Sequence, residues 1–358
     1  MKQFSIPAVL TVTLVTLVGI SLGEGINLYW QDVIMFMGIN IILSASLNLV
    51  NGYMGEFSCG HAGFMAVGAY VSSLVSVALF TQSSLFGAPI LSSGWAVPLF
   101  PLCLLAGMAA AAISGLLVAI PSFKTRGDYL AIITIAASFI IKSAIENIKP
   151  IGGARGFMGM GQVTAAMSGT ADLPWMMFWV FLGVVFTIWI LRRFVSSTYG
   201  KGILAISQDE IAAEIMSVNT NKMKIVAFML SSGLAGLAGG LFAHKLGYVN
   251  PGSFTILKST ECLVMVYLGG MGSLSGSVLS AVVYTLMLEI LRFVIPWIND
   301  LLRWAQLIPT DYQVTQIWKW VLIPLLLVLL MQFRPEGIMG RHELADYFPW
   351  IKKFYRFR

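Results

Sequence analysis

Charged residues are scarce in this 358-residue sequence. Asp, Glu, Lys and Arg make up 11% of it, whereas hydrophobic residues make up 58%. A soluble domain usually has about a quarter of its residues charged. The composition excludes an ordinary soluble protein and predicts an all-α polytopic membrane protein. The net charge of +6 implies no nucleic-acid partner, because cytoplasmic loops of membrane proteins collect Lys and Arg.

Cysteine and histidine are also scarce, with three of each. Cys59, Cys103 and Cys262 lie in apolar or glycine-rich surroundings without metal-ligand spacing. This context is typical of buried thiols and not of disulfides or ligands. The histidines are far apart in the sequence, which argues against a metal triad. We therefore expect neither a metal nor a cofactor.

Motifs for hydrolysis are missing. The sequence has no G-x-x-x-x-G-K-[ST] phosphate loop, since Gly200-Lys201 lacks both the upstream Gly and the following Ser or Thr. Residues 272–276 read GSLSG, with Leu where a G-x-S-x-G elbow has its nucleophile. We expect that the chain is not an enzyme and does not itself hydrolyse ATP.

Long apolar segments account for most of the chain. We predict about ten spans, near 6–23, 32–50, 62–81, 95–120, 128–148, 174–192, 223–243, 259–270, 274–296 and 317–333. With the N-terminus inside, 14 of the 22 Lys and Arg residues fall in cytoplasmic segments and 6 outside. This bias supports the orientation. We predict one transmembrane domain over 1–358, a cytoplasmic loop at 193–222 and a cytoplasmic tail at 334–358, so that both termini are cytoplasmic.

The longest polar stretch between two apolar runs is 199–224. Leu204, Ile211, Ile215 and Val218 recur there near helical spacing, which predicts a short amphipathic helix. Flanking basic residues place it in the cytoplasm. Such a helix either contacts a soluble partner or covers the end of the helix bundle.

A glycine-rich stretch at 51–68 interrupts the helical pattern. It also carries polar side chains at Asn51, Glu56, Ser58 and His61. A charge at bilayer depth costs roughly 2.5–3.5 kcal/mol, so Glu56 should face protein or water. Broken backbone at that depth is tolerated where it is buried in protein or lines a cavity. We predict that these four residues line a translocation pathway; the alternative is a tight cytoplasmic turn with an exposed Glu.

A second broken stretch at 247–276 resembles the first loosely. It opens with Gly-Tyr, carries one acid, Glu261, and ends in a glycine cluster. The likeness suggests two related halves that meet at a central site, and adds Glu261 to the predicted pathway. Elsewhere, Gly107, Ala111 and Gly115 lie four apart, a spacing that lets helix backbones approach closely in lipid.

Several motifs together resemble one transporter family. They are NLVNGYMGEFSCGHAGFMAVGAY from residue 48, RGDYLAIIT at 126–134, GGARG at 152–156, GKGILAISQDEIAAEIMSVN from 200, KIVAFMLSSGLAGLAGGLFA from 224, LVMVYLGGMGSLSGSVLSA from 263 and FRPEGIMG from 333. They resemble the branched-chain amino-acid ABC transporter permease family, LivM-like subunits in particular, in the right order over nearly the whole chain. The permeases for urea uptake share these motifs.

The resemblance implies the ABC importer permease fold in a bacterial cytoplasmic (inner) membrane. It implies a heterodimer with a second homologous permease, two ABC ATPase subunits that bind the ATP, and an extracytoplasmic binding protein that delivers branched-chain or other hydrophobic amino acids. Residues 207–219 are similar to the EAA-type segment that couples permease to ATPase. The matching positions are Asp209, Glu210, Ala212, Ala213 and Glu214, with Ser217 where the family usually has Gly.

Two further departures bear on the substrate. Glu56 stands where the family often has Leu or Gln, and Phe139 stands where the fifth span often has Glu. Uptake of urea or short-chain amides is therefore an alternative within the same architecture. An ion-coupled secondary transporter and a membrane scaffold are alternatives of other classes. The ion-coupled transporter is disfavoured because such a protein is expected to have several acidic residues in its spans, and these spans do not have them.

Overall fold

The computed structural model describes residues 27–83, 85–123, 129–170, 173–304 and 315–333, together with residue 19 and parts of 336–346. The chain is an all-α polytopic protein, and its described strands form one short antiparallel ribbon that pairs Phe157 with Val249. The elements are α2 (Leu28–Asn48), α3 (His61–Phe80), α4 (Ala96–Ser122), α5 (Tyr129–Asn147), β1 (Phe157–Met158), α6 (Met160–Ser168), α7 (Trp175–Ser196), α8 (Thr198–Gln208), α9 (Glu210–Ile215), α10 (Thr220–Leu246), β2 (Tyr248–Val249), α11 (Ile256–Gly269), α12 (Leu274–Trp304) and α13 (Lys319–Phe333).

Seven helices in the described part of the chain are long and apolar enough to cross a membrane. They are Leu28–Tyr53, His61–Phe80, Ala96–Ser122, Tyr129–Asn147, Trp175–Ser196, Thr220–Leu246 and Leu274–Trp297. Each coincides within a few residues with a predicted span. The predicted span 6–23 and most of the predicted tail 334–358 lie outside the described residues.

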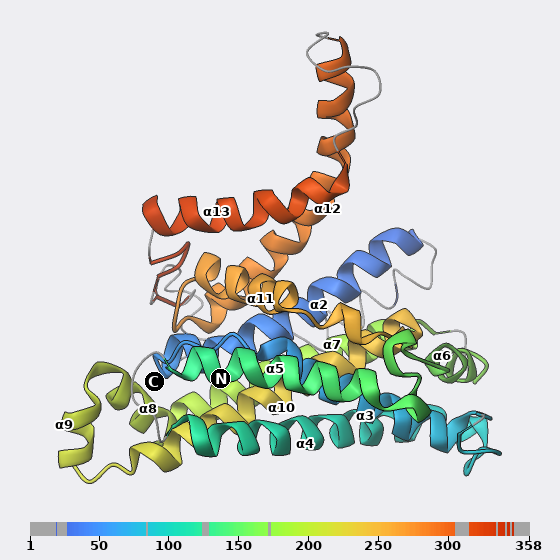
Figure 1. Ribbon diagram of the computed structural model, residues 1–358, viewed down its shortest axis with the longest axis horizontal. Helices are drawn as coiled ribbons and strands as arrows, with labels where there is room; N and C mark the ends of the chain where they lie inside the picture. The colour runs from blue at the N-terminus through green and yellow to red at the C-terminus, as the bar shows by residue number, and fades with distance from the viewer. Residues whose placement is uncertain are drawn as a thin grey trace, which may run out of the picture.

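The predicted spans 259–270 and 317–333 form shorter helices. α11 has 14 residues and α13 has 15, which gives each roughly 21–23 Å at 1.5 Å per residue. A hydrocarbon core is about 30 Å thick, and neither helix is among the seven described helices that are long and apolar enough to cross it. In Figure 1 the end of α12 projects away from the bundle and α13 runs back outside α11.

Helix α10 forms the centre of the bundle and packs against α3 and α4. Small residues permit this contact, as the glycine spacing predicts: a Cβ at Gly68 would lie 2.2 Å from the Cα of Gly236, and a Cβ at Gly107 would lie 2.6 Å from the Gly68 carbonyl oxygen. At Gly115 it would lie 1.9 Å from the Ser232 hydroxyl. Any side chain at these positions would push the helices apart.

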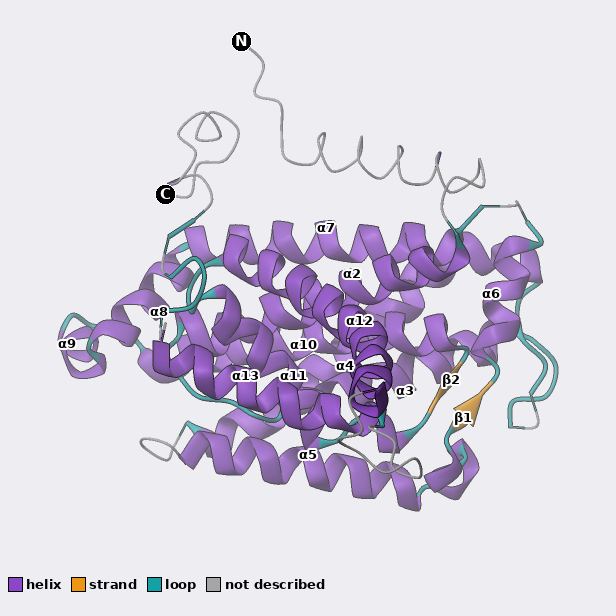
Figure 2. Ribbon diagram, turned by 90° about the horizontal axis from the view of Figure 1, so that it is seen from above, coloured by secondary structure: helices purple, strands orange, loops and turns teal. Residues whose placement is uncertain are grey.

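The bundle has two distinct ends (Figure 2). Helices α8 and α9 lie at one end, and the β1–β2 ribbon lies with α6 at the other. We call these the α9 end and the ribbon end. Gly156 precedes the ribbon with φ 89°, and a Cβ there would lie 2.3 Å from the Val249 carbonyl oxygen. Glycine therefore permits both the turn and the strand contact.

Candidate functional site

The polar stretch at 199–224 folds into two helices separated by one extended residue. Asp209 has φ −157° and ψ 112°, and its side chain accepts a hydrogen bond from the Ala212 amide at 3.0 Å, so it caps α9. The predicted continuous apolar face is therefore wrong: Leu204 lies on α8, whereas Ile211 and Ile215 lie on α9 beyond the break. Sequence periodicity missed the break because an Asp at this position competes with helix continuation through its side chain.

The turn after α9 has the geometry that glycine favours, although Ser217 occupies it. Ser217 has φ 63°. Its amide donates to the Glu214 carbonyl at 2.9 Å, and the Val218 amide donates to the Ala213 carbonyl at 3.1 Å. These two bonds define a Schellman motif. Ser217 therefore forms the same turn that Gly would form. The serine backbone is strained in this left-handed conformation, because the residue has a side chain.

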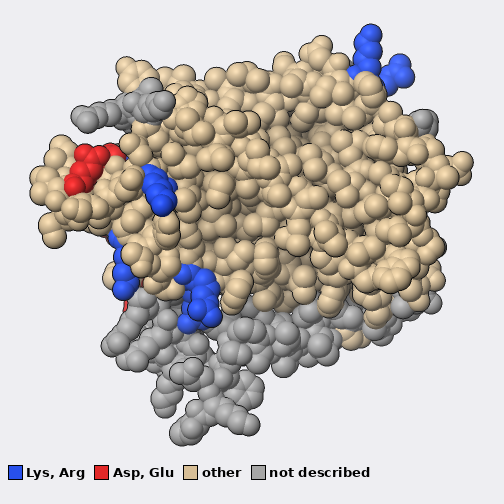
Figure 3. All heavy atoms as spheres, turned by 90° about the horizontal axis from the view of Figure 1, so that it is seen from below, with Lys and Arg blue, Asp and Glu red and all other residues tan. Residues whose placement is uncertain are grey.

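Helix α9 projects from the bundle and exposes large apolar side chains. Ile211, Ile215 and Met216 are 69%, 77% and 79% exposed, whereas Ala213 on the same helix is buried. Figure 3 shows acidic side chains on this projecting end, with Lys and Arg beside it. Single exposed apolar residues are common, but three within six residues beside acids suit a docking surface.

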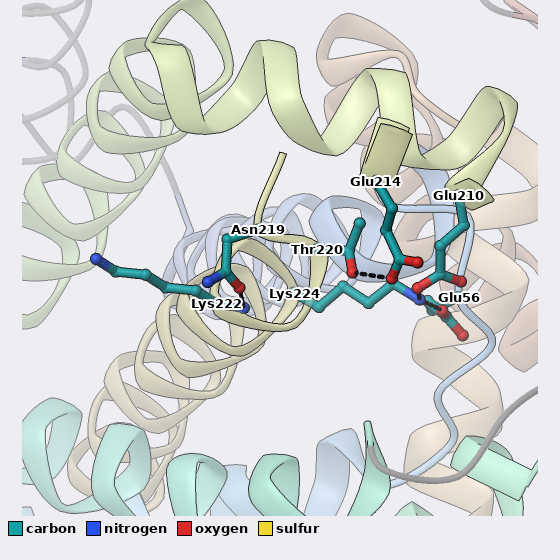
Figure 4. Close-up of polar contacts among 7 residues, drawn as sticks. All are labelled: Glu56, Glu210, Glu214, Asn219, Thr220, Lys222 and Lys224. Carbon is teal, nitrogen blue, oxygen red and sulfur yellow. Dashed lines mark hydrogen bonds and ion pairs between the residues drawn. The ribbon is translucent and has the colours of Figure 1, made fainter. Parts of the chain in front are cut away.

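Lys224 connects α9 to the first glycine-broken stretch. Its ammonium lies 2.6 Å from Oε1 of Glu56 and 2.8 Å from Oε1 of Glu210. The Lys224 side chain is only 7% exposed, against 22% for Glu56 and 46% for Glu210. Figure 4 shows Lys224 extended toward both carboxylates, whereas Lys222 points the other way. One buried cation thus holds two segments that are more than 150 residues apart in sequence.

The same loop is tied to α10 at two further points. The Thr220 hydroxyl donates to Oε1 of Glu214 at 2.9 Å, as the dashed line in Figure 4 marks. Asn219 caps α10 by accepting a hydrogen bond from the Lys222 amide at 3.0 Å. The α9 loop is consequently joined to the start of α10 by side chains on both sides, and a displacement of α9 would act on α10.

The segment that carries Glu56 is held by Asn51 and Ser58. The Asn51 side chain accepts from the Ser58 amide at 3.3 Å and donates to the Ser58 carbonyl at 3.4 Å. Both residues are buried. Asn51 itself lies in a π-helical turn, Leu49–Tyr53, a feature that often occurs at functional sites. Asn51 and Ser58 therefore fix the loop that presents Glu56 to Lys224.

The two glycine-broken stretches meet near the π-helical turn. The Asn48 side chain donates to the Ser273 carbonyl at 2.8 Å and to the Ser277 hydroxyl at 2.7 Å, and it accepts from the Gly272 amide at 3.0 Å. A Cβ at Gly52 would lie 2.3 Å from the Gly272 nitrogen. The sequence pattern suggested this meeting, and the contacts come from a residue that sequence reasoning did not select.

Glu343 lies at the start of α12, beside the same meeting point. Its carboxylate accepts from the amides of Leu274 at 2.8 Å and Ser275 at 3.1 Å, and from the Tyr53 hydroxyl at 3.3 Å. A carboxylate at a helix N-terminus satisfies free amides and interacts favourably with the helix dipole. The FRPEGIMG motif brings this residue into place, because the Ile338 amide donates to the Leu268 carbonyl at 2.9 Å.

The predicted pathway residues do not all lie together. Asn51, Glu56 and Ser58 share one loop, and His61 follows it at the start of α3, buried with its ring 2.8 Å from the Ser46 hydroxyl. Glu261 lines a separate cavity, pairs with Lys258 and has none of the other four beside it there. Phe139, at the position where the family often has Glu, is 51% exposed on α5.

Lys224 and Asn48 are the functional candidates that sequence reasoning missed. A signal existed for both. A Lys at the start of an apolar helix needs a partner when it is buried, and an Asn within an apolar run needs hydrogen bonds. Which partner each residue takes depends on tertiary contacts and is not encoded locally.

Comparison with known proteins agrees with the motifs. The profile of the family described as "Branched-chain amino acid transport system / permease component" matches residues 29–331. LivM, a high-affinity branched-chain amino acid transport system permease protein, is 30% identical in both Salmonella typhimurium and Escherichia coli K12, over 86% of this chain and 69% of the relative. The probable LivM of Methanocaldococcus jannaschii is 24% identical over 90% of this chain and 95% of the relative.

A second kind of permease also matches. LivH of Salmonella typhimurium is 21% identical over 87% of this chain and 96% of the relative. No solved structure matches the chain. The match covers most of the chain, including both glycine-broken stretches and the α9 loop, so the protein belongs to the family of branched-chain amino acid transport permease components.

Proposed function

We propose that this chain is the transmembrane permease subunit of an ABC importer in a bacterial cytoplasmic membrane. It translocates branched-chain or other hydrophobic amino acids that an extracytoplasmic binding protein delivers, together with a second homologous permease. Two partner ATPases bind and hydrolyse the ATP. Family membership and the names of the relatives support this assignment. The observation that carries the mechanism is the Lys224 bridge between α9 and the Glu56 loop.

The distribution of charge supports the orientation. With the α9 end in the cytoplasm, a group of described basic residues lies on the cytoplasmic side, at the end of α7, on α8 and at the start of α10: Arg192, Arg193, Lys201, Lys222 and Lys224. The ribbon end then faces the binding protein. The two glycine-broken stretches meet in the half of the bundle that adjoins α9, close to the helix on which we propose that the ATPases act.

Helix α9 suits docking into a groove on an ATPase. Ile211 and Ile215 on this helix and Met216 directly after it are exposed, with Glu210 and Glu214 beside them. Amphipathic helices commonly bind partners by inserting such an apolar face into a hydrophobic groove. The caps and the Schellman turn hold the face rigid in the free subunit, so little ordering entropy is lost on docking.

The Lys224 bridge gives a route for transmitting movement. When the ATPases close, displacement of α9 would carry Glu210 with it and strain or break the Glu210–Lys224–Glu56 contacts. The Glu56 loop adjoins the π-helical turn that contacts Gly272, so a shift there changes how the two broken stretches meet. Such a change alters access to the pathway, and substrate drives it only through different affinities for the two states.

The function is tested by uptake in cells. A strain that lacks this chain should lose uptake of labelled leucine, and the chain expressed with its permease, ATPase and binding-protein partners should restore it in a vanadate-sensitive manner. Restored urea uptake without leucine uptake would keep the architecture and move the substrate to amides. Vanadate-resistant uptake would point to an ion-coupled transporter.

The docking assignment is tested by charge reversal on α9. The double variant Glu210→Lys with Glu214→Lys should insert into the membrane normally but should lose the ATPases on purification. A control with matched charge is Asp32→Lys with Glu146→Lys, at the far ends of α2 and α5, which should keep the ATPases. Normal co-purification with the α9 variant would contradict the docking role.

A further inference from the structure

A cavity of about 450 Å³ lies between α2, α10, α11, α12 and α13. It is on the side where α12 and α13 lean away from the bundle in Figure 1. Ligand pockets commonly measure about 300–1,000 Å³. Lys245, in the last turn of α10, lies 4.1 Å from the ring centroid of Phe36, which lines the cavity. The cavity therefore belongs to the half of the bundle near the ribbon end, away from α9.

Charges of both signs line this cavity. Lys258 and Glu261 come from α11, with Nζ 2.7 Å from Oε2. Glu289 and Arg292 come from α12, with Oε2 3.8 Å from Nη1. Each pair is three residues apart on its own helix, so each is held on one wall. Glu289 also accepts a hydrogen bond from the Tyr29 hydroxyl of α2, so the α12 pair also joins α12 to α2. Both pairs present a cation and an anion to the cavity.

The remaining lining residues are one further cation, Lys319 of α13, and apolar or neutral side chains. Phe36 and Phe242 contribute aromatic rings, and Leu288 contributes an aliphatic side chain. The Asn40 amide donates to the Thr285 hydroxyl at 3.0 Å, so these two buried polar groups are satisfied. The cavity therefore combines an apolar wall with two ion pairs and a third cation, a small number of polar groups that would fix the orientation of a ligand.

We propose that this cavity is a transit subsite for a free zwitterionic amino acid with an apolar side chain. The ligand ammonium would bind between Glu289 and Glu261, its carboxylate would bind between Arg292 and Lys258, and its side chain would lie against Phe36 and Phe242. Burying a zwitterion is costly unless both of its charges are paired and hydrogen-bonded. The local pairs supply both partners. The proposal rests on the proposed function for its substrate class and adds the place where that substrate binds.

The complete transporter, assembled from this chain with its partners, tests the subsite directly. In a variant with Cys59, Cys103 and Cys262 replaced by Ala, Leu288→Cys introduces a thiol into the cavity wall, and maleimide labelling reports access to it. Saturating leucine should slow labelling at least fivefold. Neither 4-methylpentanoate, which lacks the ammonium, nor 3-methylbutylamine, which lacks the carboxylate, should protect. Met158→Cys, exposed on β1, is the control and should label equally with and without leucine.

Neutralising one ion pair tests the charges without changing net charge. Glu289→Gln with Arg292→Gln should remove leucine protection and lower leucine uptake about tenfold, with normal membrane levels and ATPase content. The control is Lys142→Gln with Glu146→Gln, which removes a pair 3.6 Å long on the outer helix α5 and should leave uptake unchanged. Uptake within twofold of wild type in the cavity variant would overturn the proposal.

The outcomes separate the subsite from the function. Leucine import by the wild-type transporter without protection of Leu288→Cys overturns the subsite alone. Protection by 4-methylpentanoate and 3-methylbutylamine equal to that by leucine also overturns the subsite, because the cavity would then bind the apolar side chain without recognising either charge. Import of urea and not of leucine overturns the subsite and the assigned substrate and keeps the importer architecture, since a neutral amide does not need paired charges.

Discussion

Replacing Lys224 by Met removes the ammonium of the bridge and keeps a side chain of similar length. The pair with Glu56 is partly buried, and a hydrogen bond to a charged group in such a place contributes about 1.5–3 kcal/mol. The pair with Glu210 has one partner that is 46% exposed, so screening reduces it to the 0.2–1 kcal/mol range of surface pairs. We expect a combined loss of roughly 2–3 kcal/mol, because two neighbouring carboxylates also lose their shared cation.

This loss should appear in coupling more than in folding. At 1.4 kcal/mol per factor of ten, the linked arrangement of α9 and the Glu56 loop becomes about 30- to 140-fold less populated relative to an unlinked one. The assay is the number of leucine molecules imported per ATP in reconstituted vesicles. Lys224→Met should hydrolyse ATP with little import, and Glu56→Gln should show most of the same defect with normal membrane levels.

A double-mutant cycle makes the reasoning refutable. Because Lys224 and Glu56 act through one contact, the double variant should be little worse than Lys224→Met, with a coupling energy of about 0.5–3 kcal/mol. Lys222→Met is the matched control, since Lys222 is exposed and points away from the bridge. Additive effects of Lys224→Met and Glu56→Gln would refute the bridge, as would an equal defect in Lys222→Met.

Three further predictions concern local structure. Ser217→Gly should relieve about 1 kcal/mol of left-handed strain and slow hydrogen exchange of the α9 amides, and unchanged or faster exchange would contradict the strain. Gly68→Val should lower the unfolding midpoint by the equivalent of at least 1–3 kcal/mol of overpacking, because a Cβ there lies 2.2 Å from Gly236, whereas Gly94→Ala, with nothing within 4 Å, should not. Burial raises the pKa of the Cys59 thiol to about 11, so roughly 0.03% of the thiol is thiolate at pH 7.5. Alkylation of Cys59 should therefore be slow. Its rate should rise tenfold per pH unit without a plateau up to pH 9.

Helix existence was predictable from sequence because hydrophobic runs of about 20 residues leave few other structures possible in a bilayer. Seven predicted spans coincide with helices long enough to cross it. The segment 259–270 was predicted as a span, yet α11 is a 14-residue helix. A run of 10–14 apolar residues fits a partial span as well as a full one. The short length of 259–270 was therefore the one feature of the sequence that indicated a partial span.

The candidate site was less predictable because its contacts join distant segments. The similarity to a coupling segment located α9 and its acids, and the cap at Asp209 follows local rules. That Glu56 would meet Lys224 could not be inferred, since the pairing depends on how α10 packs beside the loop held by Asn51 and Ser58. A partner 168 residues away leaves no local pattern in a single sequence.

Import by the purified transporter tests the account most directly. This chain would be reconstituted with its second permease, ATPases and binding protein into vesicles that contain ATP on the ATPase side, and labelled leucine would be offered on the other. We predict leucine accumulation that requires ATP, stops with vanadate on the ATPase side and disappears when this chain is omitted. Accumulation driven by an ion gradient without ATP, or import of urea in place of leucine, would contradict it.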